Sequence, residues 1–476
     1  MVCRFGIGGS GITFSVHIVL TNAGNTYDWY IIYFIIFVSL ITNSQTYITL
    51  NLLPMRESFL HFLWRWRRFD AQNLTTTEGK TVEILHPGEW NTDAGPDFFN
   101  ARVRIGDTVW AGNVEIHVRA SEWQVHGHTG DPAYDNVVLH VVLEEDRPAL
   151  RANGGRIPGL ELKDRIPANL LETWQRLENE RAWIPCEHFF KNIPGIVRLN
   201  WLDRLLVERL EEKTTAISET LAATENHWEE AFYRAMARNF GLKINAEPFE
   251  ALARSLPLLT LAKHKNDLKQ LEALLFGQAG MLTETFKDDY PNGLAREYKF
   301  LRHKYGLSPL SPGQWKFLRL RPANFPTVRL AQFAALVHQS AHLFSKILEV
   351  KNLRELENLF DVQASEYWLT HFQFDKPSAK RPKRLGRDFI RVIIINTIAT
   401  FLFHYGKLRK QEEFQKRALQ LLEELPAESN ALLEGWAHLG VEARNAYQSQ
   451  ALIHLKTRYC DARRCLECAV GNAILK

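Results

Sequence analysis

The sequence predicts two structural parts, an α/β domain over residues 55–165 and a mainly α-helical domain over residues 166–476. Two observations predict this class. Between residues 55 and 165, runs with apolar residues at every second position alternate with short helical segments, whereas the later segments repeat apolar residues at helical spacing. The composition, with 46% hydrophobic and 24% charged residues, is typical of a globular protein with more than one core.

Residues 1–54 differ in character from the rest of the chain. Their apolar run Trp29–Ile41 is shorter than the roughly 18–20 residues that cross a bilayer as a helix. Neither a basic leader nor a small-residue cleavage site accompanies it. At Met55 a charged amphipathic segment begins. We therefore expect Met55 to be the natural initiator and residues 1–54 to be an extension that is disordered or not translated. We also expect a cytoplasmic protein without firm membrane association.

A helix is expected over Glu57–Phe69, with Phe59, Leu60, Leu63 and Trp66 on its apolar face.

Four strands are expected next, because apolar residues alternate or form β-branched runs between turn signals. Gly106-Asp107 is the strongest of these signals and predicts a hairpin. A short helix or loop over Glu122–His128 precedes the last strand, which gives the order α-β-β-β-α-β. The expected strands cover Thr81–Leu85, Ala101–Ile105, Thr108–Val118 and Asn136–Leu143.

The remaining two-thirds of the chain shows apolar residues at helical spacing, and Pro426 ends the last of these segments. No repeat of fixed period stands out. The expected helices include Leu170–Leu177, Trp201–Leu221, His227–Phe240, Leu268–Leu275, Leu330–Val350, Phe389–Tyr405 and Glu412–Leu425.

Acidic side chains on neighbouring strands form the first candidate site. Asp97 follows Gly95-Pro96, and Glu115 and His117 share one face of the next strand because strand side chains alternate. Mg²⁺ prefers carboxylate oxygens from separate points of a rigid sheet, and a bound cation activates water for attack on a phosphate. His117 is then placed to orient that water.

These residues resemble the PD-(D/E)XK nuclease superfamily over roughly Glu57 to Leu143. The resemblance implies a restriction-endonuclease-like fold in which Asp97 and Glu115 hold the metal and the early helix supplies Glu57 as a further acidic ligand. In that family a lysine usually stands where this sequence has His117, so the role of the third residue differs.

The register of the hairpin decides whether this site forms. A tight turn at Gly106-Asp107 pairs Ile105 with Thr108 and sets Asp97 opposite Ile116, facing away from Glu115. The site therefore requires a bulge, an odd-length turn or a splay of the strands. The alternative is that Asp97 lies in a turn and Glu115 is a solvated strand residue.

Histidines make a second cluster. His126 and His128 flank a glycine, and His140 follows in the last strand. Imidazoles ligate Zn²⁺, so a zinc hydrolase centred on these three residues is one hypothesis. The alternative is a polar loop whose histidines hydrogen bond locally.

Three cysteines near the C-terminus, Cys460, Cys465 and Cys468, have a spacing suited to Zn²⁺ or an iron–sulfur cluster. Cys186 is the remaining candidate for a fourth ligand. Some PD-(D/E)XK nucleases are similar, holding a [4Fe–4S] cluster with one distant and three C-terminal cysteines at a different spacing. The alternative is free buried thiols. Five cysteines in 476 residues exclude a disulfide scaffold.

A basic run covers Lys376–Arg391, with seven basic residues and one acidic residue, although the formal net charge of the whole chain is only +4. Such a run either follows a nucleic-acid backbone or forms a solvated linker. The residues expected to contact nucleic acid are Lys380, Arg381, Lys383, Arg384 and Arg387.

The chain from Met55 onward also resembles an uncharacterised bacterial family, domain of unknown function 2851. The stretches that carry the likeness are GEWNTDAGPDFFNA, GNVEIHV, SEWQVHGH, DNVVLHVV, LRLRPANFPTVRLAQ and YCDARRCLECAVG. This resemblance supports one unit from Met55 to Lys476 and implies no reaction.

Together these features predict a Mg²⁺-dependent phosphodiester hydrolase that acts on DNA or RNA. Two alternatives stay open: a catalytically inactive nuclease fold that binds nucleic acid or assists assembly, and the zinc hydrolase. The sequence leaves the oligomeric state open.

Overall fold

The computed structural model describes residues 2–6, 13–17, 55–340 and 342–476. The chain divides into two compact units, Met1–Met55 and Arg56–Lys476. In the first unit, strand β1 (Val2–Gly6) pairs antiparallel with β2 (Thr13–His17). The apolar run Trp29–Ile41, like most of the predicted extension, lies outside the described residues.

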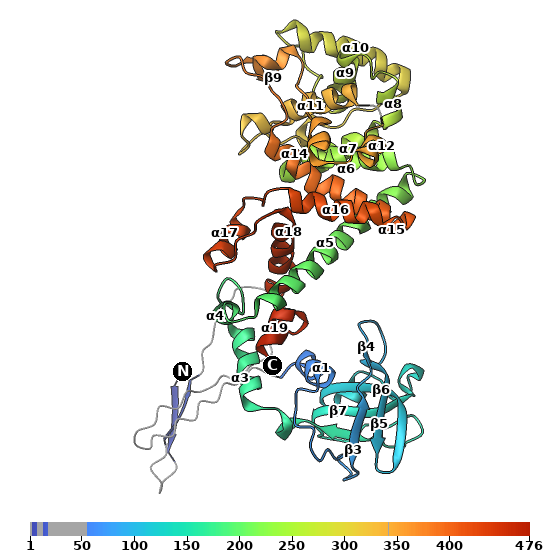
Figure 1. Cartoon of the computed structure of the whole chain (residues 1–476), viewed down its shortest axis with the longest axis vertical. Helices are drawn as coiled ribbons and strands as arrows, with labels where there is room; N and C mark the ends of the chain where they lie inside the picture. Colours follow the sequence, from blue (N-terminus) through green and yellow to red (C-terminus); the bar gives the residue numbers. More distant parts are fainter. Residues whose placement is uncertain (1, 7–12, 18–54, 341) are drawn as a thin grey trace. The chain divides into compact units, whose positions relative to one another are not determined.

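The second unit begins with helix α1 (Glu57–Trp66) and a mixed sheet, as the sequence predicts (Figure 1). The sheet order is β3-β5-β6-β7-β8, and β4 pairs with β5. The first three strands are antiparallel, whereas β7 runs parallel to both β6 and β8. The strands are β3 (Val82–His86), β4 (Glu89–Trp90), β5 (Phe98–Ile105), β6 (Thr108–Arg119), β7 (Val137–Glu144) and β8 (Gly159–Glu161).

Helix α1 packs on β6 and buries Phe59, Leu60 and Leu63. The prediction for Trp66 was wrong, because this side chain is 49% exposed. The buried tryptophan is Trp64, whose indole N–H donates to the carbonyl of Pro87 at 2.9 Å. Trp66 is the last residue of the helix, and Arg67 then turns the chain in the left-handed conformation. The Trp66 side chain therefore remains at the exposed end of α1.

A bulge in β5 sets the register of the hairpin. Ile105 pairs with Thr108 across the tight turn, but Phe98 pairs with Val114 while Ala101 pairs with Gly112, so one extra residue lies on β5. Asn100 occupies the bulge with a positive φ of 58°, a conformation that asparagine tolerates. The bulge shifts Asp97 by one residue and brings it opposite Glu115.

The crossover from β6 to the parallel strand β7 carries α2 (Glu122–Val125) and a 3-10 turn, η1 (Pro132–Tyr134). Trp123 and Val137 anchor it in a small core with Ala149 and Ile157. The Trp123 indole N–H donates to the carbonyl of Leu150 at 3.1 Å, which fixes the loop that carries His126 and His128.

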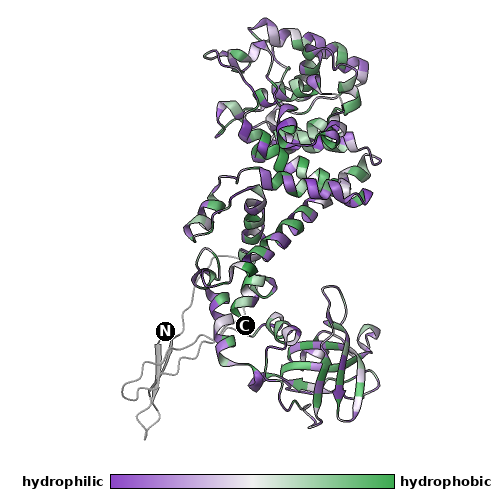
Figure 2. Cartoon of the chain, in the orientation of Figure 1, coloured by the Kyte–Doolittle hydropathy of each residue, from purple (hydrophilic) through white to green (hydrophobic). Residues whose placement is uncertain are grey.

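The rest of the unit is mostly helical, and α5 is its longest helix (Figure 1). Green and purple segments alternate along these helices, which reflects apolar faces packed inward (Figure 2). Helices from the first half of this part are α3 (Ala168–Asn179), α4 (Glu187–Phe190), α5 (Gly195–Ala223), α6 (Trp228–Phe240), α7 (Leu242–Ser255), α8 (Leu258–Ala262), α9 (Leu268–Gln278) and α10 (Asp289–Tyr305). The later helices are α11 (Pro326–Gln339), α12 (Leu343–Glu349), α13 (Leu353–Asn358), α14 (Arg387–Ile393), α15 (Ala399–Arg409), α16 (Glu412–Glu424), α17 (Ala431–His438), α18 (Ala446–His454) and α19 (Ala469–Ile474).

The helix expected over Leu330–Val350 is two helices, α11 and α12. The chain turns extended at Ser340, and the carboxylate of Glu229 accepts the N–H groups of Phe344 (3.1 Å) and Ser345 (2.8 Å). A carboxylate from another helix thus satisfies the free N–H groups at the start of α12, a break that helical periodicity does not reveal.

One helical run among the described residues, Arg387–Arg409, is long and apolar enough to cross a bilayer, and 78% of its most apolar stretch is buried in the fold. It joins α14 to α15 through a π-helical segment, Ile394–Ile398. Buried core helices have the same composition.

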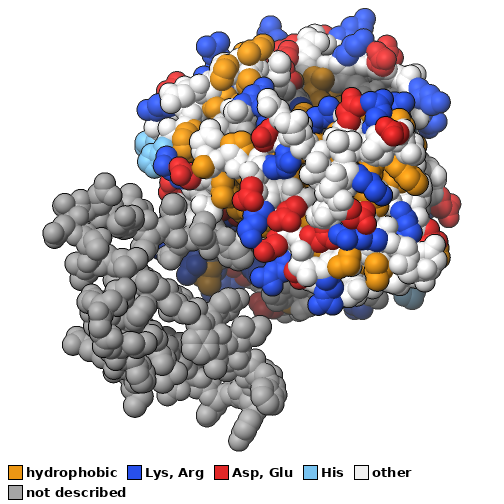
Figure 3. All heavy atoms as spheres, turned by 90° about the horizontal axis from the view of Figure 1, so that it is seen from below, with side chains coloured by type: hydrophobic (Ala, Val, Ile, Leu, Met, Phe, Trp, Pro, Cys, Tyr) orange, Lys and Arg blue, Asp and Glu red, His pale blue; other side chains and the backbone are white. Residues whose placement is uncertain are grey.

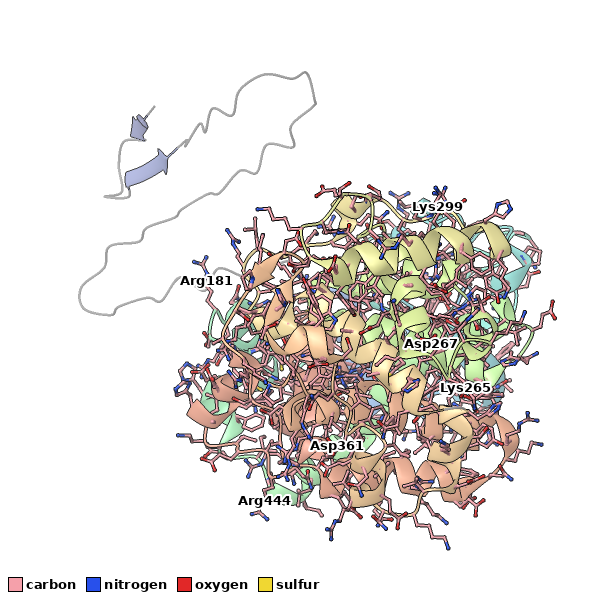
Figure 4. The ribbon with its side chains drawn as sticks, turned by 90° about the horizontal axis from the view of Figure 1, so that it is seen from above. Arg181, Lys265, Asp267, Lys299, Asp361 and Arg444 are labelled. Atoms are coloured by element: carbon pink, nitrogen blue, oxygen red, sulfur yellow. The ribbon has the colours of Figure 1, made fainter. Side chains whose placement is uncertain are left out.

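Charges of both signs are interspersed on the face seen in Figure 3. Seen from above, Arg181 and Lys299 project from the rim of the molecule (Figure 4). The face in Figure 3 shows no large field of one sign, so a site for a polyanion there would consist of a local cluster.

Candidate metal centre

Asp97 and Glu115 lie side by side at the start of β5 and the middle of β6, as the predicted site requires. The backbone N–H of Asp97 donates to Glu115 Oε2 at 3.1 Å, and the N–H of Ile116 donates to Asp97 Oδ2 at 2.9 Å. Glu115 is only 4% exposed. Burial and the nearby Asp97 carboxylate both raise its pKa, because a second negative charge in a desolvated site is unfavourable. A bound cation relieves this repulsion.

Helix α1 adds Glu57 and His61 to the same centre. Residues four apart on a helix share a face, so both side chains reach the sheet. His61 Nε2 lies 3.2 Å from Asp97 Oδ2, and Glu57 Oε1 lies 4.0 Å from His117 Nε2. His61 was not among the predicted site residues, although its spacing of four residues from Glu57 is a usable signal.

Four further histidines surround Glu115. His117 Nδ1 lies 2.8 Å from His140 Nε2, and His117 Nε2 lies 3.1 Å from His126 Nδ1. His128 Nε2 lies 3.3 Å from Glu115 Oε1. Burial lowers the pKa of His117 and His128, and it lowers that of His140 to about 3. The imidazoles of His117, His128 and His140 are therefore neutral at pH 7 and offer lone pairs to a metal ion.

Two sets of side chains could each hold a metal ion, because the ligand atoms within each set lie within 4.8 Å of one another. One set is His117, His126 and His128, and the other is Glu57, His61 and Asp97. Glu115 lies between them: its Oε1 is 3.6 Å from His117 Nε2 and its Oε2 accepts the Asp97 N–H. His140 was predicted to act with His126 and His128. Its Nε2 instead contacts Nδ1 of His117.

The side chains of both sets are of the types that bind divalent cations. His128 Nε2 is buried and forms no hydrogen bond with any residue that the structure describes. Such a nitrogen is costly unless a ligand satisfies it. Imidazoles suit Zn²⁺ and related transition metals, whereas the carboxylate-rich set also suits Mg²⁺ and Mn²⁺.

The four cysteines near the C-terminal tail and α4 are free thiols, and they are not among the sets of described residues whose ligand atoms lie within 4.8 Å of one another. Cys465 and Cys468 act electrostatically on Cys186, and Cys186 acts on Cys460, so the four lie in one region of the fold. Burial is the main cause that raises the pKa of all four thiols, and the backbone N–H groups of Val470 and Gly471 oppose this rise at Cys468.

Arg463 holds this tail against the rest of the fold. Its guanidinium donates to the carbonyls of Leu177 (3.2 Å), Glu178 (2.8 Å) and Glu180 (2.5 Å), at the end of α3 and just before Cys186. The tail spacing and the fold therefore place all four cysteines in one region.

The predicted nucleic-acid residues in the basic run have different surroundings. Lys383 is 5% exposed, donates to the Leu369 carbonyl at 2.9 Å and lies over the Phe372 ring. Arg384 pairs with Asp361 at 3.3 Å. Four of the five predicted residues are exposed: Lys380, Arg381, Arg384 and Arg387.

Comparisons with known proteins add a family but no activity. No curated protein and no solved structure matches the chain. A family model described as "Protein of unknown function (DUF2851)" matches residues 57–431, which include Glu57 and the whole candidate metal centre. The match covers most of the chain, so the protein belongs to this family.

Proposed function

We propose that the protein is a metal-dependent phosphodiester hydrolase that acts on DNA or RNA, with a restriction-endonuclease-like α/β domain. The observation that carries the proposal is the convergence of Glu57, Asp97 and Glu115 with His117 at one end of the sheet. The antiparallel strands β3, β5 and β6, followed by a crossover to parallel β7, support the fold.

We assign a hard divalent cation, Mg²⁺ or Mn²⁺, to Glu57, His61 and Asp97 with Glu115 beside them, and a transition metal such as Zn²⁺ to the three imidazoles. When bound, such ions lower the pKa of a coordinated water and neutralise charge on a phosphate undergoing displacement. Glu115 and His117 form a side of the site that excludes water, because they are only 4% and 1% exposed.

The exposure of the three carboxylates separates their roles. The Glu57 side chain is 39% exposed, whereas those of Asp97 and Glu115 are 19% and 6% exposed. Glu57 therefore lies on the solvent-facing side of the candidate site, where it would complete the oxygen ligands of the cation. His117 lies between His140, at Nδ1, and His126, at Nε2, and its Nε2 is 3.6 Å from Glu115 Oε1, where it would help to orient a water on the cation.

A second candidate is a zinc hydrolase that uses the imidazoles alone. The observation in its favour is that His117, His126 and His128 converge without needing Asp97. An inactive scaffold that binds nucleic acid is the non-enzymatic alternative.

Cleavage of labelled single- and double-stranded DNA and RNA, with added Mg²⁺, Mn²⁺ or Zn²⁺, tests the proposal. Asp97→Asn keeps an oxygen for the Ile116 N–H, so the fold is retained while a charged ligand is lost. We expect Asp97→Asn and Glu115→Gln to lower cleavage by at least about 100-fold, whereas the exposed turn variant Asp107→Asn leaves it unchanged. Both variants cleaving like the parent would exclude this mechanism. Loss only on His128→Ala would favour the zinc hydrolase.

We further propose that Cys186, Cys460, Cys465 and Cys468 bind one Zn²⁺ or a [4Fe–4S] cluster that fastens the tail to the segment after α3. The Arg463 contacts, which hold the tail beside the segment that precedes Cys186, support this assignment. Thiolate ligands and free thiols both suit a reducing compartment, and we propose a cytoplasmic location.

A further inference from the structure

A groove of about 990 Å³ lies beside α1 and is lined by four arginines and two accessible tryptophans. We call it the Arg–Trp groove and define it by Arg65, Trp66, Arg68, Trp90 and Arg204. Its volume is at the upper end of the roughly 300–1,000 Å³ typical of small-molecule sites. It therefore has room for an extended ligand.

Three of the four arginines lack acidic partners: Arg65, Arg68 and Arg204 form no ion pair with any described residue. Burial and the nearby Arg204 guanidinium both lower the pKa of Arg65, an effect that Glu467 opposes, so guanidinium groups from α1 and α5 repel each other across the groove. An anion between them removes this repulsion.

The acidic residues of the groove are already engaged by other side chains. Tyr459 Oη donates to Glu208 at 2.9 Å, Lys407 Nζ donates to Glu211 at 2.6 Å, and Arg464 pairs with Glu467. Four arginines and Lys476 outnumber the three glutamates in the lining, so the side-chain charge of the groove is positive.

Two indole rings give the groove a stacking surface. The Arg65 guanidinium lies 5.3 Å from the Trp66 ring centre and 4.7 Å from that of Trp90. Trp66 is 49% exposed at the end of α1, where a buried residue had been expected. Accessible aromatic faces beside arginines stack unpaired bases, which duplexes do not present.

The groove also leads to the metal centre. A smaller cavity of about 210 Å³ is lined by Arg65, Trp66 and Trp90 as well as by His61. His61 Nε2 lies 3.2 Å from Asp97 Oδ2. A chain that leaves the groove through this cavity arrives at the proposed ligands.

We propose that the Arg–Trp groove binds single-stranded nucleic acid and leads its backbone to the metal centre. The part of this inference that leads the backbone to a catalytic centre rests on the proposed function. Binding in the groove can be measured without cleavage. The arginines hold phosphates and Trp66 and Trp90 stack bases, so recognition is single-stranded and tolerant of sequence.

Fluorescence anisotropy of the full-length protein tests the inference, with labelled deoxythymidine and uridine oligonucleotides of about 12 nucleotides and a duplex of equal length. No divalent metal is added, which prevents cleavage. We expect preference for the single strands. Trp66→Ala should weaken binding by about 10-fold, whereas Trp66→Phe retains most of it, since stacking of one base is worth about 1–3 kcal/mol. Arg204→Ala should also lower the salt slope by about 1.

Matched controls lie on the sheet. Trp110 is 46% exposed and Arg102 is exposed, and neither lines the groove. Trp110→Ala and Arg102→Ala should leave binding unchanged. Equal effects of groove and control variants, tighter binding of the duplex, or unchanged binding by Trp66→Ala would overturn the inference. Binding lost in groove variants, with no cleavage in any metal, would uphold the groove and refute the hydrolase. Cleavage that depends on Asp97 but not on the groove would do the reverse.

Discussion

Asp97 and Glu115 hold each other in place through the backbone: the N–H of Asp97 donates to the Glu115 carboxylate, and the residue after Glu115 donates its N–H to the Asp97 carboxylate. This reciprocal pair exists because Asn100 adds one residue to β5. Two like charges thus remain adjacent at a cost that a cation can offset.

The bulge makes a first prediction. Asn100→Val should lower the free energy of unfolding by about 1–2 kcal/mol, because a β-branched residue is strained at positive φ. Asn100→Gly should keep the parent stability and activity. Urea unfolding measures the difference, and Arg102→Val, at an exposed strand position, controls for valine itself. Equal stability of the valine and glycine variants would contradict the role of the bulge.

The histidine set makes a second prediction, on metal content. His128→Ala should lose transition metal after dialysis, as measured by elemental analysis. His140→Gln should weaken metal affinity by about 10–100-fold, because His140 orients His117 and does not touch the metal. The exposed His188→Ala is the control. Unchanged metal in His128→Ala would refute the imidazole site.

The cysteine cluster predicts a bound metal or cluster in anaerobically purified protein. An iron–sulfur cluster gives a brown protein with broad visible absorbance, whereas zinc gives a colourless protein with one equivalent of metal beyond any held by the imidazole set. Cys186→Ser should abolish either signal and increase trypsin cleavage at the tail. Cys3→Ser, outside the predicted four, serves as the control. A protein without iron or zinc would leave only buried thiols.

Glu272 predicts a pH-dependent stability away from the metal centre. It is 1% exposed and accepts hydrogen bonds from Tyr290 and Ser365, and burial raises its pKa from 4.5 to about 7. Between these values the folded protein keeps a proton that the unfolded chain releases. The free energy of unfolding therefore falls as pH rises through this window, by on the order of 3 kcal/mol at most.

Glu272→Gln removes this titration and should flatten the pH dependence of unfolding between about pH 5 and 7. Urea unfolding at several pH values measures it. The exposed Glu284→Gln should retain the parent profile. The same slope in Glu272→Gln as in the parent would show that another group titrates.

Lys383 separates structure from binding in the basic run. Lys383→Gln should lower the melting temperature, because its ammonium holds the Leu369 carbonyl and lies over the Phe372 ring. Arg381→Gln, at an exposed site, should keep stability and weakens nucleic-acid binding only if the run contacts phosphates. An unchanged melting temperature for Lys383→Gln would contradict its structural role.

Local pattern predicted the main strands and most long helices, because alternation and helical spacing persist over many residues there. It missed the two-residue strand β4 and the three-residue strand β8, which are too short to show a period. The break before α12 depends on Glu229, far away in the sequence.

The candidate site shows the same limit. Strand alternation put Glu115 and His117 on one face, and spacing grouped the tail cysteines. The meeting of Asp97 with Glu115 depended on a bulge that turn chemistry alone does not predict. Trp66 was misplaced because periodicity does not reveal where a helix passes the edge of the sheet it covers.

The bulge at Asn100 also constrains how the family can diverge. A single insertion or deletion within one strand, between the turn and its acidic residue, turns that side chain to the opposite face of the sheet, whereas a matched change in both strands keeps the two acids together. The two strands in related chains should therefore change length together wherever both acids are retained. Chains with a change of one residue in a single strand should have lost one acid or gained a compensating irregularity.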